Sequence, residues 1–177
     1  MQKYNNITNE YSSIIYNSKE AYQDFIDNHG PYKYFISITP SRNYTEQQLY
    51  RKINFLLKVL SRNIFNSKKT DIFLKGFCIF ESSSAGSRCT KHIHIIIKDD
   101  SRLDLKKPFI DTFTESINRL KVMINDNYTS ANDFSKECYD VKPIYDQKHL
   151  IGYLTDEFWK DRNGDFIKLI HNTGLVI

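Results

Sequence analysis

Cysteine is scarce in this chain, and its placement excludes two common classes of protein. Of 177 residues only three are cysteines, Cys78, Cys89 and Cys138, and none has the Cys-x-x-Cys spacing of zinc and redox motifs. An odd number of scattered cysteines also argues against a disulfide framework. We therefore expect a protein of a reducing compartment.

Long apolar stretches and targeting signals are also missing. No run approaches the roughly 20 apolar residues that cross a bilayer, and the N-terminus has no basic start followed by an apolar core. No Walker motif occurs, so the chain carries no recognisable helicase. We expect no membrane association and a cytoplasmic location.

What the chain does contain is ordinary for a globular protein. Hydrophobic residues make up 40% and charged residues 26%, and 25 basic against 21 acidic residues give a net charge of +4. This charge is compatible with nucleic-acid binding without requiring it. The length predicts a single domain over residues 1–177, in which the polar residues 1–30 form an N-terminal extension.

The hydrophobic pattern predicts an α+β fold. Strands alternate or are wholly apolar, and helices carry apolar residues at helical spacing. Strands are expected at 34–39, 72–80, 90–98, 139–144 and 166–170, and helices at 17–28, 45–64, 109–124 and 146–160. The second and third strands form a hairpin, and Pro143 indicates an edge strand or the end of a strand. We expect a central antiparallel β-sheet with helices packed on it.

The most informative motif lies in the third predicted strand. His92 and His94 are separated by Ile93 in an otherwise β-branched run. Because residues i and i+2 of a strand point to the same face, the two imidazoles lie side by side. Such a pair is half of a site for a divalent metal. A partly exposed strand that carries two histidines by chance is the alternative.

Two further residues could complete a reactive site. Glu81 ends the second strand, so the hairpin brings it near His92 as an oxygen ligand. Tyr153 lies beside the apolar stripe of the last predicted helix. A tyrosine hydroxyl, with an ordinary pKa of about 10, is a poor nucleophile unless a metal activates the phosphate under attack. A solvated Glu81 and an interfacial Tyr153 are the plainer readings.

Together these segments resemble the HUH endonucleases, over roughly residues 33–160. The matching features are Phe35-Ile36-Ser37-Ile38-Thr39, Glu81, His92-Ile93-His94 and Ile151-Gly152-Tyr153-Leu154-Thr155. The chain is most similar to single-tyrosine rolling-circle replication initiators (Rep proteins). The resemblance implies a ferredoxin-like or RRM-like nuclease fold, Mg2+ or Mn2+ held by His92, His94 and Glu81, and a 5′-phosphotyrosine intermediate on Tyr153.

The resemblance also implies partners and a setting. The substrate is single-stranded DNA at an origin or element end. A host helicase would open the duplex, and a homodimer would supply a second tyrosine. Such proteins belong to bacterial or archaeal cells, their plasmids or their viruses. Arg88, Lys91, Lys148 and Lys160 are the candidate DNA contacts.

Some choices remain open at this stage. Replication initiators commonly carry a lysine three residues after the tyrosine, where this chain has Asp156. Glu157 lies where small single-strand transposases carry a polar metal ligand, so it rivals Glu81. A transposase of the same superfamily and a non-catalytic nucleic-acid-binding module are the alternative functions. Tyr145 could replace Tyr153, and the relaxase order would use one of Tyr4, Tyr11 and Tyr16.

Overall fold

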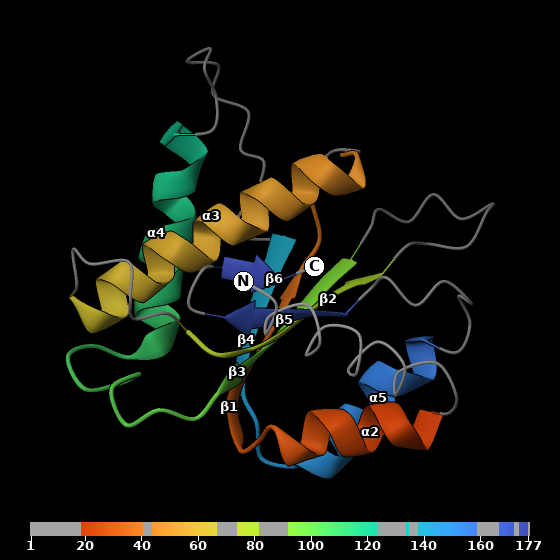
Figure 1. The fold of residues 1–177 in the computed structure, drawn as a ribbon. Coiled ribbons are helices and arrows are strands. Elements are labelled where there is room, and N and C mark those ends of the chain that lie inside the picture. Colours follow the sequence, from red (N-terminus) through yellow and green to blue (C-terminus); the bar gives the residue numbers. More distant parts are fainter. Residues whose placement is uncertain are drawn as a thin grey trace, which may run out of the picture.

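Helices cover both faces of one antiparallel sheet (Figure 1). The computed structural model describes residues 19–40, 44–66, 74–81, 92–123, 134, 138–158, 167–171 and 174–176. The helices of these residues are α2 (Lys19–Asn28), α3 (Glu46–Phe65), α4 (Phe109–Met123) and α5 (Gln147–Phe158). The strands are β1 (Tyr32–Ile38), β2 (Gly76–Glu81), β3 (His92–Lys98), β4 (Tyr139–Pro143), β5 (Ile167–His171) and β6 (Gly174–Val176). The predicted α+β class is thus confirmed.

The order of the strands places β3 inside the sheet. The sheet runs β4-β1-β3-β2-β5-β6, and all its neighbouring strands are antiparallel. The predicted hairpin is confirmed, because β2 pairs with β3 from Gly76 opposite Ile97 to Glu81 opposite His92. β4 lies at one edge, as Pro143 indicated. The short β6, which pairs with β5, was not expected from the sequence.

The second strand starts later than predicted, and Gly76 explains why. Its φ of 149° lies in a region that side chains avoid. A Cβ at this position would lie 1.9 Å from the carbonyl oxygen of Ile96. Glycine therefore lets the chain enter the sheet next to β3, and Leu74 and Lys75 precede the strand.

Strand β3 is buried on both of its faces, and each face meets a different pair of helices. Ile93, Ile95 and Ile97 pack into the larger core beneath α3 and α4. Ile96 packs into a smaller core with Ile26 of α2 and Leu154 of α5. This alternation follows from the two-residue period of a strand, and it sends His92 and His94 to the α2 and α5 side.

Helix α3 begins where the sequence predicts. Thr45 and Gln48 form a reciprocal capping box, in which Thr45 Oγ1 accepts from the Gln48 amide at 3.2 Å and Gln48 Oε1 accepts from the Thr45 amide at 3.0 Å. The predicted apolar face of this helix is buried throughout: Leu49, Ile53, Leu56, Leu57, Leu60 and Ile64. This helix anchors the larger core.

Helix α2 belongs to the packed fold, although residues 1–30 had been expected as an extension. It packs against α5 (Figure 1), and Ile26 is fully buried between α2 and the sheet. The expected helix start at Asn17 lies outside the described residues. The part of this segment that the structure describes therefore helps to hold the last helix in place.

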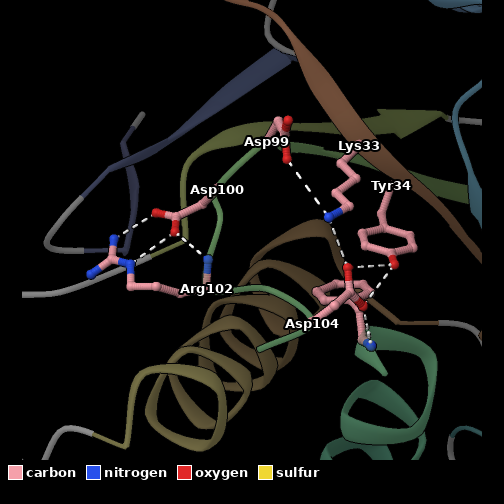
Figure 2. A network of polar contacts seen from close by, with 7 residues as sticks. Lys33, Tyr34, Asp99, Asp100, Arg102 and Asp104 are labelled. Carbon is pink, nitrogen blue, oxygen red and sulfur yellow. Dashed lines mark hydrogen bonds and ion pairs between the residues drawn. The ribbon is translucent and has the colours of Figure 1, made fainter. Parts of the chain in front are cut away.

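At the end of the sheet away from the histidines, Asp104 joins β1 to α4 through three residues (Figure 2). Its carboxylate accepts hydrogen bonds from the Tyr34 hydroxyl at 2.8 and 2.9 Å and from the Phe109 amide at 2.8 Å, and it pairs with Lys33 at 2.9 Å. Burial alone would raise the pKa of Asp104, but the bonds from Lys33, Phe109 and Tyr34 outweigh it and lower the pKa. Asp104 thus ties β1 to the start of α4.

We expect Asp104→Ala to lower the free energy of unfolding by about 1–3 kcal/mol, because the partly buried Tyr34 hydroxyl loses its acceptor and Lys33 keeps only the more distant Asp99, at 3.9 Å. Asp140 is the matched control, since its pair with Lys142 is local and both side chains are more than half exposed. Asp140→Ala should cost less than about 1 kcal/mol. Urea denaturation at neutral pH measures both, and equal costs would contradict the bridging role of Asp104.

The pair of Asp100 with Arg102 predicts how the stability of the protein depends on pH. The hydrogen bond from Arg102 lowers the pKa of Asp100 from its ordinary value to about 2. A lowered native pKa adds stability above the unfolded pKa of about 3.9, and this stability is lost as pH falls toward 2. The acid-induced loss of stability between about pH 4 and 2 should therefore be shallower in Asp100→Asn than in the wild type, as urea titrations at several pH values would measure. An identical pH dependence would contradict this assignment.

Candidate active site

The two histidines lie side by side on the face of the sheet that α2 and α5 cover. His94 is opposite Ser37 of β1 and Ile79 of β2, and His92 is opposite Glu81. Because the sheet is pleated, these opposed residues share a face. His94 is buried, with 5% of its surface exposed, and His92 is half-buried. The pair therefore lies where the apolar cover of this face gives way to solvent.

A hydroxyl from the neighbouring strand holds the ring of His92. Thr39 Oγ1 lies 2.9 Å from His92 Nδ1. Thr39 follows the last residue of β1, and its amide donates to the Cys138 carbonyl at 2.7 Å. The bond at Nδ1 leaves Nε2 as the nitrogen of His92 that can meet a ligand.

Two aromatic rings pack against His94. The Phe35 ring is stacked on it, with a centroid distance of 5.3 Å and an interplanar angle of 24°. The Tyr153 ring meets it edge to face, at 6.1 Å and 72°. Phe35 comes from β1 and Tyr153 from α5, so this contact joins the sheet to the last helix. The structure thus brings together His92, His94 and Tyr153, which were selected separately from the sequence.

Helix α5 sets the position of Tyr153. Asp146 caps the helix, as predicted, by accepting from the His149 amide at 2.9 Å. Ile151 and Leu154 point into the smaller core, and Tyr153 therefore lies at the edge of the buried face of the helix. The Tyr153 ring contacts His94. The side chain is nevertheless 48% exposed, and part of its surface therefore faces solvent.

Polar contacts with α2 and with the start of β1 fix α5 along its length. Gln23 of α2 donates to the Thr155 hydroxyl at 2.9 Å. At the other end of α5, Gln147 accepts from the Tyr32 amide at 2.9 Å and donates to Asp27 at 2.6 Å. Since Thr155 comes two residues after Tyr153, these contacts restrain the tyrosine relative to the sheet.

Glu81 and Glu157 are the two carboxylates that the sequence offers as a third ligand beside the histidines. The register puts the Glu81 backbone directly opposite His92, as the hairpin requires. Glu157 belongs to the last turn of α5, and the structure describes neither of these two side chains. Among the side chains that it does describe, no three His, Cys, Asp or Glu residues are grouped closely enough to hold a metal. The described donors for a cation are thus the two imidazoles.

The candidate DNA contacts are only partly described. Lys148 is exposed in the first turn of α5, and Tyr145, the rival nucleophile, is 93% exposed just before that helix. The described residues do not include Arg88, Lys91 and Lys160, nor the N-terminal Tyr4, Tyr11 and Tyr16.

The cysteines agree with the expectation of free thiols as far as the structure describes them. Cys89 lies outside the described residues. Of the described cysteines, Cys78 is buried and Cys138 is half-buried, and neither is in a disulfide. No described helix is long and apolar enough to cross a membrane.

Sequence reasoning missed two residues of the site. The sequence predicts Thr39 and Phe35 only as parts of the first strand, a segment that also carries the resemblance, and assigns neither a role in the site, yet both contact the histidines. A signal was present, because Phe35, Ser37 and Thr39 alternate with Ile36 and Ile38 and so share one face. It could not be used without knowing that β1 is the neighbour of β3.

Comparison of the chain with protein-family models, curated proteins and solved structures gives no match. The function must therefore be inferred from the arrangement of these side chains and from their chemistry.

The border position of Tyr153 predicts that its hydroxyl matters little for folding. Tyr153→Phe should change the free energy of unfolding by less than about 1 kcal/mol, as is usual for partly exposed sites. Leu154→Ala should cost about 2–5 kcal/mol, because Leu154 is fully buried. Urea denaturation of both variants tests this. A Tyr153→Phe cost as large as that of Leu154→Ala would contradict the position of Tyr153.

Proposed function

We propose that this protein is a metal-dependent endonuclease of the HUH type, which nicks and joins single-stranded DNA through Tyr153. The observation that carries the proposal is the contact between the Tyr153 and His94 rings at 6.1 Å. It brings a half-exposed tyrosine from α5 to a pair of imidazoles on β3. A nucleophile and a phosphate-binding centre must meet in this way for phosphoryl transfer.

His92, His94 and Glu81 are the residues that would hold the divalent metal, Mg2+ or Mn2+. The donor types fit such an ion, because two imidazoles lie on one strand face and the Glu81 backbone is opposite His92 in the register. When bound, the ion would neutralise the phosphate oxygens and orient the phosphorus. Glu81 is preferred to Glu157 because its backbone pairs with that of a histidine.

Tyr153 carries the covalent step in this proposal. Its hydroxyl oxygen forms a bond to the phosphorus, and the bond from phosphorus to the 3′ oxygen of the preceding nucleotide breaks. The tyrosine proton passes to solvent, and the departing oxygen takes up a proton to give a free 3′ hydroxyl. The 5′ end remains as a phosphotyrosine, and a second 3′ hydroxyl reverses the reaction to join strands.

The topology of the sheet supports the finer fold assignment. The segment β1-α3-β2-β3-α4-β4 has the β-α-β-β-α-β order of ferredoxin-like folds, and its strands lie in the order β4-β1-β3-β2. The RRM-like nuclease fold implied by the resemblance has this arrangement. α2, α5, β5 and β6 are additions to it in this chain.

The source of positive charge near Tyr153 differs from that of the replication initiators, which carry a lysine where this chain has Asp156. Lys148 is exposed on the same helix, and Lys160, Arg88 and Lys91 are the other basic residues near the site in sequence. We assign DNA phosphate contacts to these four. The role as a replication initiator, with a host helicase and a homodimer, is part of the same proposal.

The direct test is the formation of a covalent adduct. The wild-type protein, incubated with single-stranded oligonucleotides and Mn2+, should give a slower band on a denaturing gel, and a chelator should abolish it. Tyr153→Phe should lose the adduct by at least about a thousandfold, since the nucleophile is absent. Tyr145→Phe is the matched control, because Tyr145 precedes the same helix and is 93% exposed.

Two outcomes would overturn the proposal. An adduct that survives in Tyr153→Phe and is lost in Tyr145→Phe would move the nucleophile to Tyr145. Binding of single-stranded DNA without any adduct, over a library of sequences, would favour the non-catalytic binding module. The DNA around the gene separates the two enzymatic roles, because a transposase acts at hairpin-bearing element ends and an initiator at an origin.

The choice of carboxylate has its own test. Glu81→Gln should raise the Mn2+ concentration required for half-maximal adduct formation by about 10–100-fold, because an anionic ligand is lost. Glu157→Gln is the matched control, and it should leave that concentration nearly unchanged. The opposite pattern would assign the third ligand to Glu157.

A further inference from the structure

We propose that Thr39 is a positioning residue, which holds His92 in its Nδ1–H tautomer and so presents the Nε2 lone pair to a divalent cation. This inference rests on the proposed function for the identity of the ligand. It goes further by naming a residue outside the ligand set and the atom through which His92 binds.

The geometry places the Thr39 hydroxyl firmly. It lies 2.9 Å from His92 Nδ1, within hydrogen-bond distance, although the two residues are 53 positions apart in sequence. The Ile38–Ile93 pair brings the end of β1 beside the start of β3. The bond from the Thr39 amide to Cys138 then fixes the backbone from the other side, through β4. Thr39 is thus held between two strands and does not depend on a flexible loop.

The direction of this hydrogen bond determines which nitrogen of His92 can bind a metal. A neutral imidazole has one N–H and one lone pair. If Nδ1 accepted the hydroxyl proton of Thr39, Nε2 would carry the hydrogen and could not bind a metal. If Nδ1 donates to Thr39 Oγ1, the lone pair lies on Nε2. Thr39 is only partly buried, so water can accept its hydroxyl proton.

His94 provides the contrast within the same site. The Phe35 and Tyr153 rings pack against it and orient the plane of its imidazole. Ring packing of this kind does not select a nitrogen, whereas the Thr39 hydroxyl meets one particular nitrogen of His92. Strand β1 therefore orients both histidines, one by stacking and the other by a hydrogen bond.

The test uses imidazole 15N NMR on the metal-free full chain at about pH 8.5, about two units above the ordinary imidazole pKa. The wild type should show His92 as the Nδ1–H tautomer. Thr39→Val keeps the shape of the side chain and removes the hydroxyl, so His92 should move toward the Nε2–H form. Thr39→Ser, which retains the hydroxyl, should keep the wild-type tautomer.

Mn2+ binding, followed by electron paramagnetic resonance without DNA, gives the second measurement. Affinity should fall by about 10–100-fold in Thr39→Val and recover in Thr39→Ser. Ser37→Ala is the matched control, since Ser37 lies on the same strand face and should bind Mn2+ as the wild type does. Unchanged tautomer and affinity in Thr39→Val would overturn the role of Thr39 alone. A wild type that binds no Mn2+ would overturn the proposed metal site as well.

Discussion

The pairing of β3 with β1 on one side and β2 on the other is the interaction on which the candidate site depends. It buries β3 on both faces, and it fixes which residues of β1 and β2 lie beside the histidines. A slip of one residue would carry His92 and His94 to the α3 and α4 side and turn Ile93 and Ile95 to the α2 and α5 side. Burying two imidazoles in an apolar core costs far more than burying two isoleucines. Hydrophobic burial therefore selects the register that presents the histidines.

The two cores differ in size and in their position relative to the candidate site. The core under α3 and α4 holds most of the buried apolar residues, whereas the core under α2 and α5 is a small cluster that includes Ile26, Ile151 and Leu154. The histidines lie at the border of this small cluster. The apolar side chains of this cluster do not extend beyond the histidines. His94 is therefore buried, while Tyr153 is half-exposed. A site at such a border combines rigid support with access for a long substrate.

Local signals account for what the sequence predicted well. The hairpin, the Thr45 capping box and the apolar stripe of α5 are each defined by residues close together in the chain. The shared face of His92 and His94 follows from strand geometry alone. By contrast, the hydrogen bond between Thr39 and His92 depends on which strands are neighbours, and no local pattern gives that order. The packing of α2 against α5 was missed for the same reason, and β6 is too short to give a periodic signal.

The contact between Gln23 and Thr155 has a consequence for the timing of assembly. The two residues are 132 positions apart, and the helices that carry them hold Tyr153 against the sheet. A ribosome must therefore release the chain beyond Thr155 before these contacts can hold the tyrosine against the histidines. The strands β1, β2 and β3 can pair earlier, because the hairpin and β1 are complete by residue 98. The imidazole pair can thus be in place before α4, β4 and α5 have been synthesised, so a nascent chain carries the two histidines without their tyrosine neighbour.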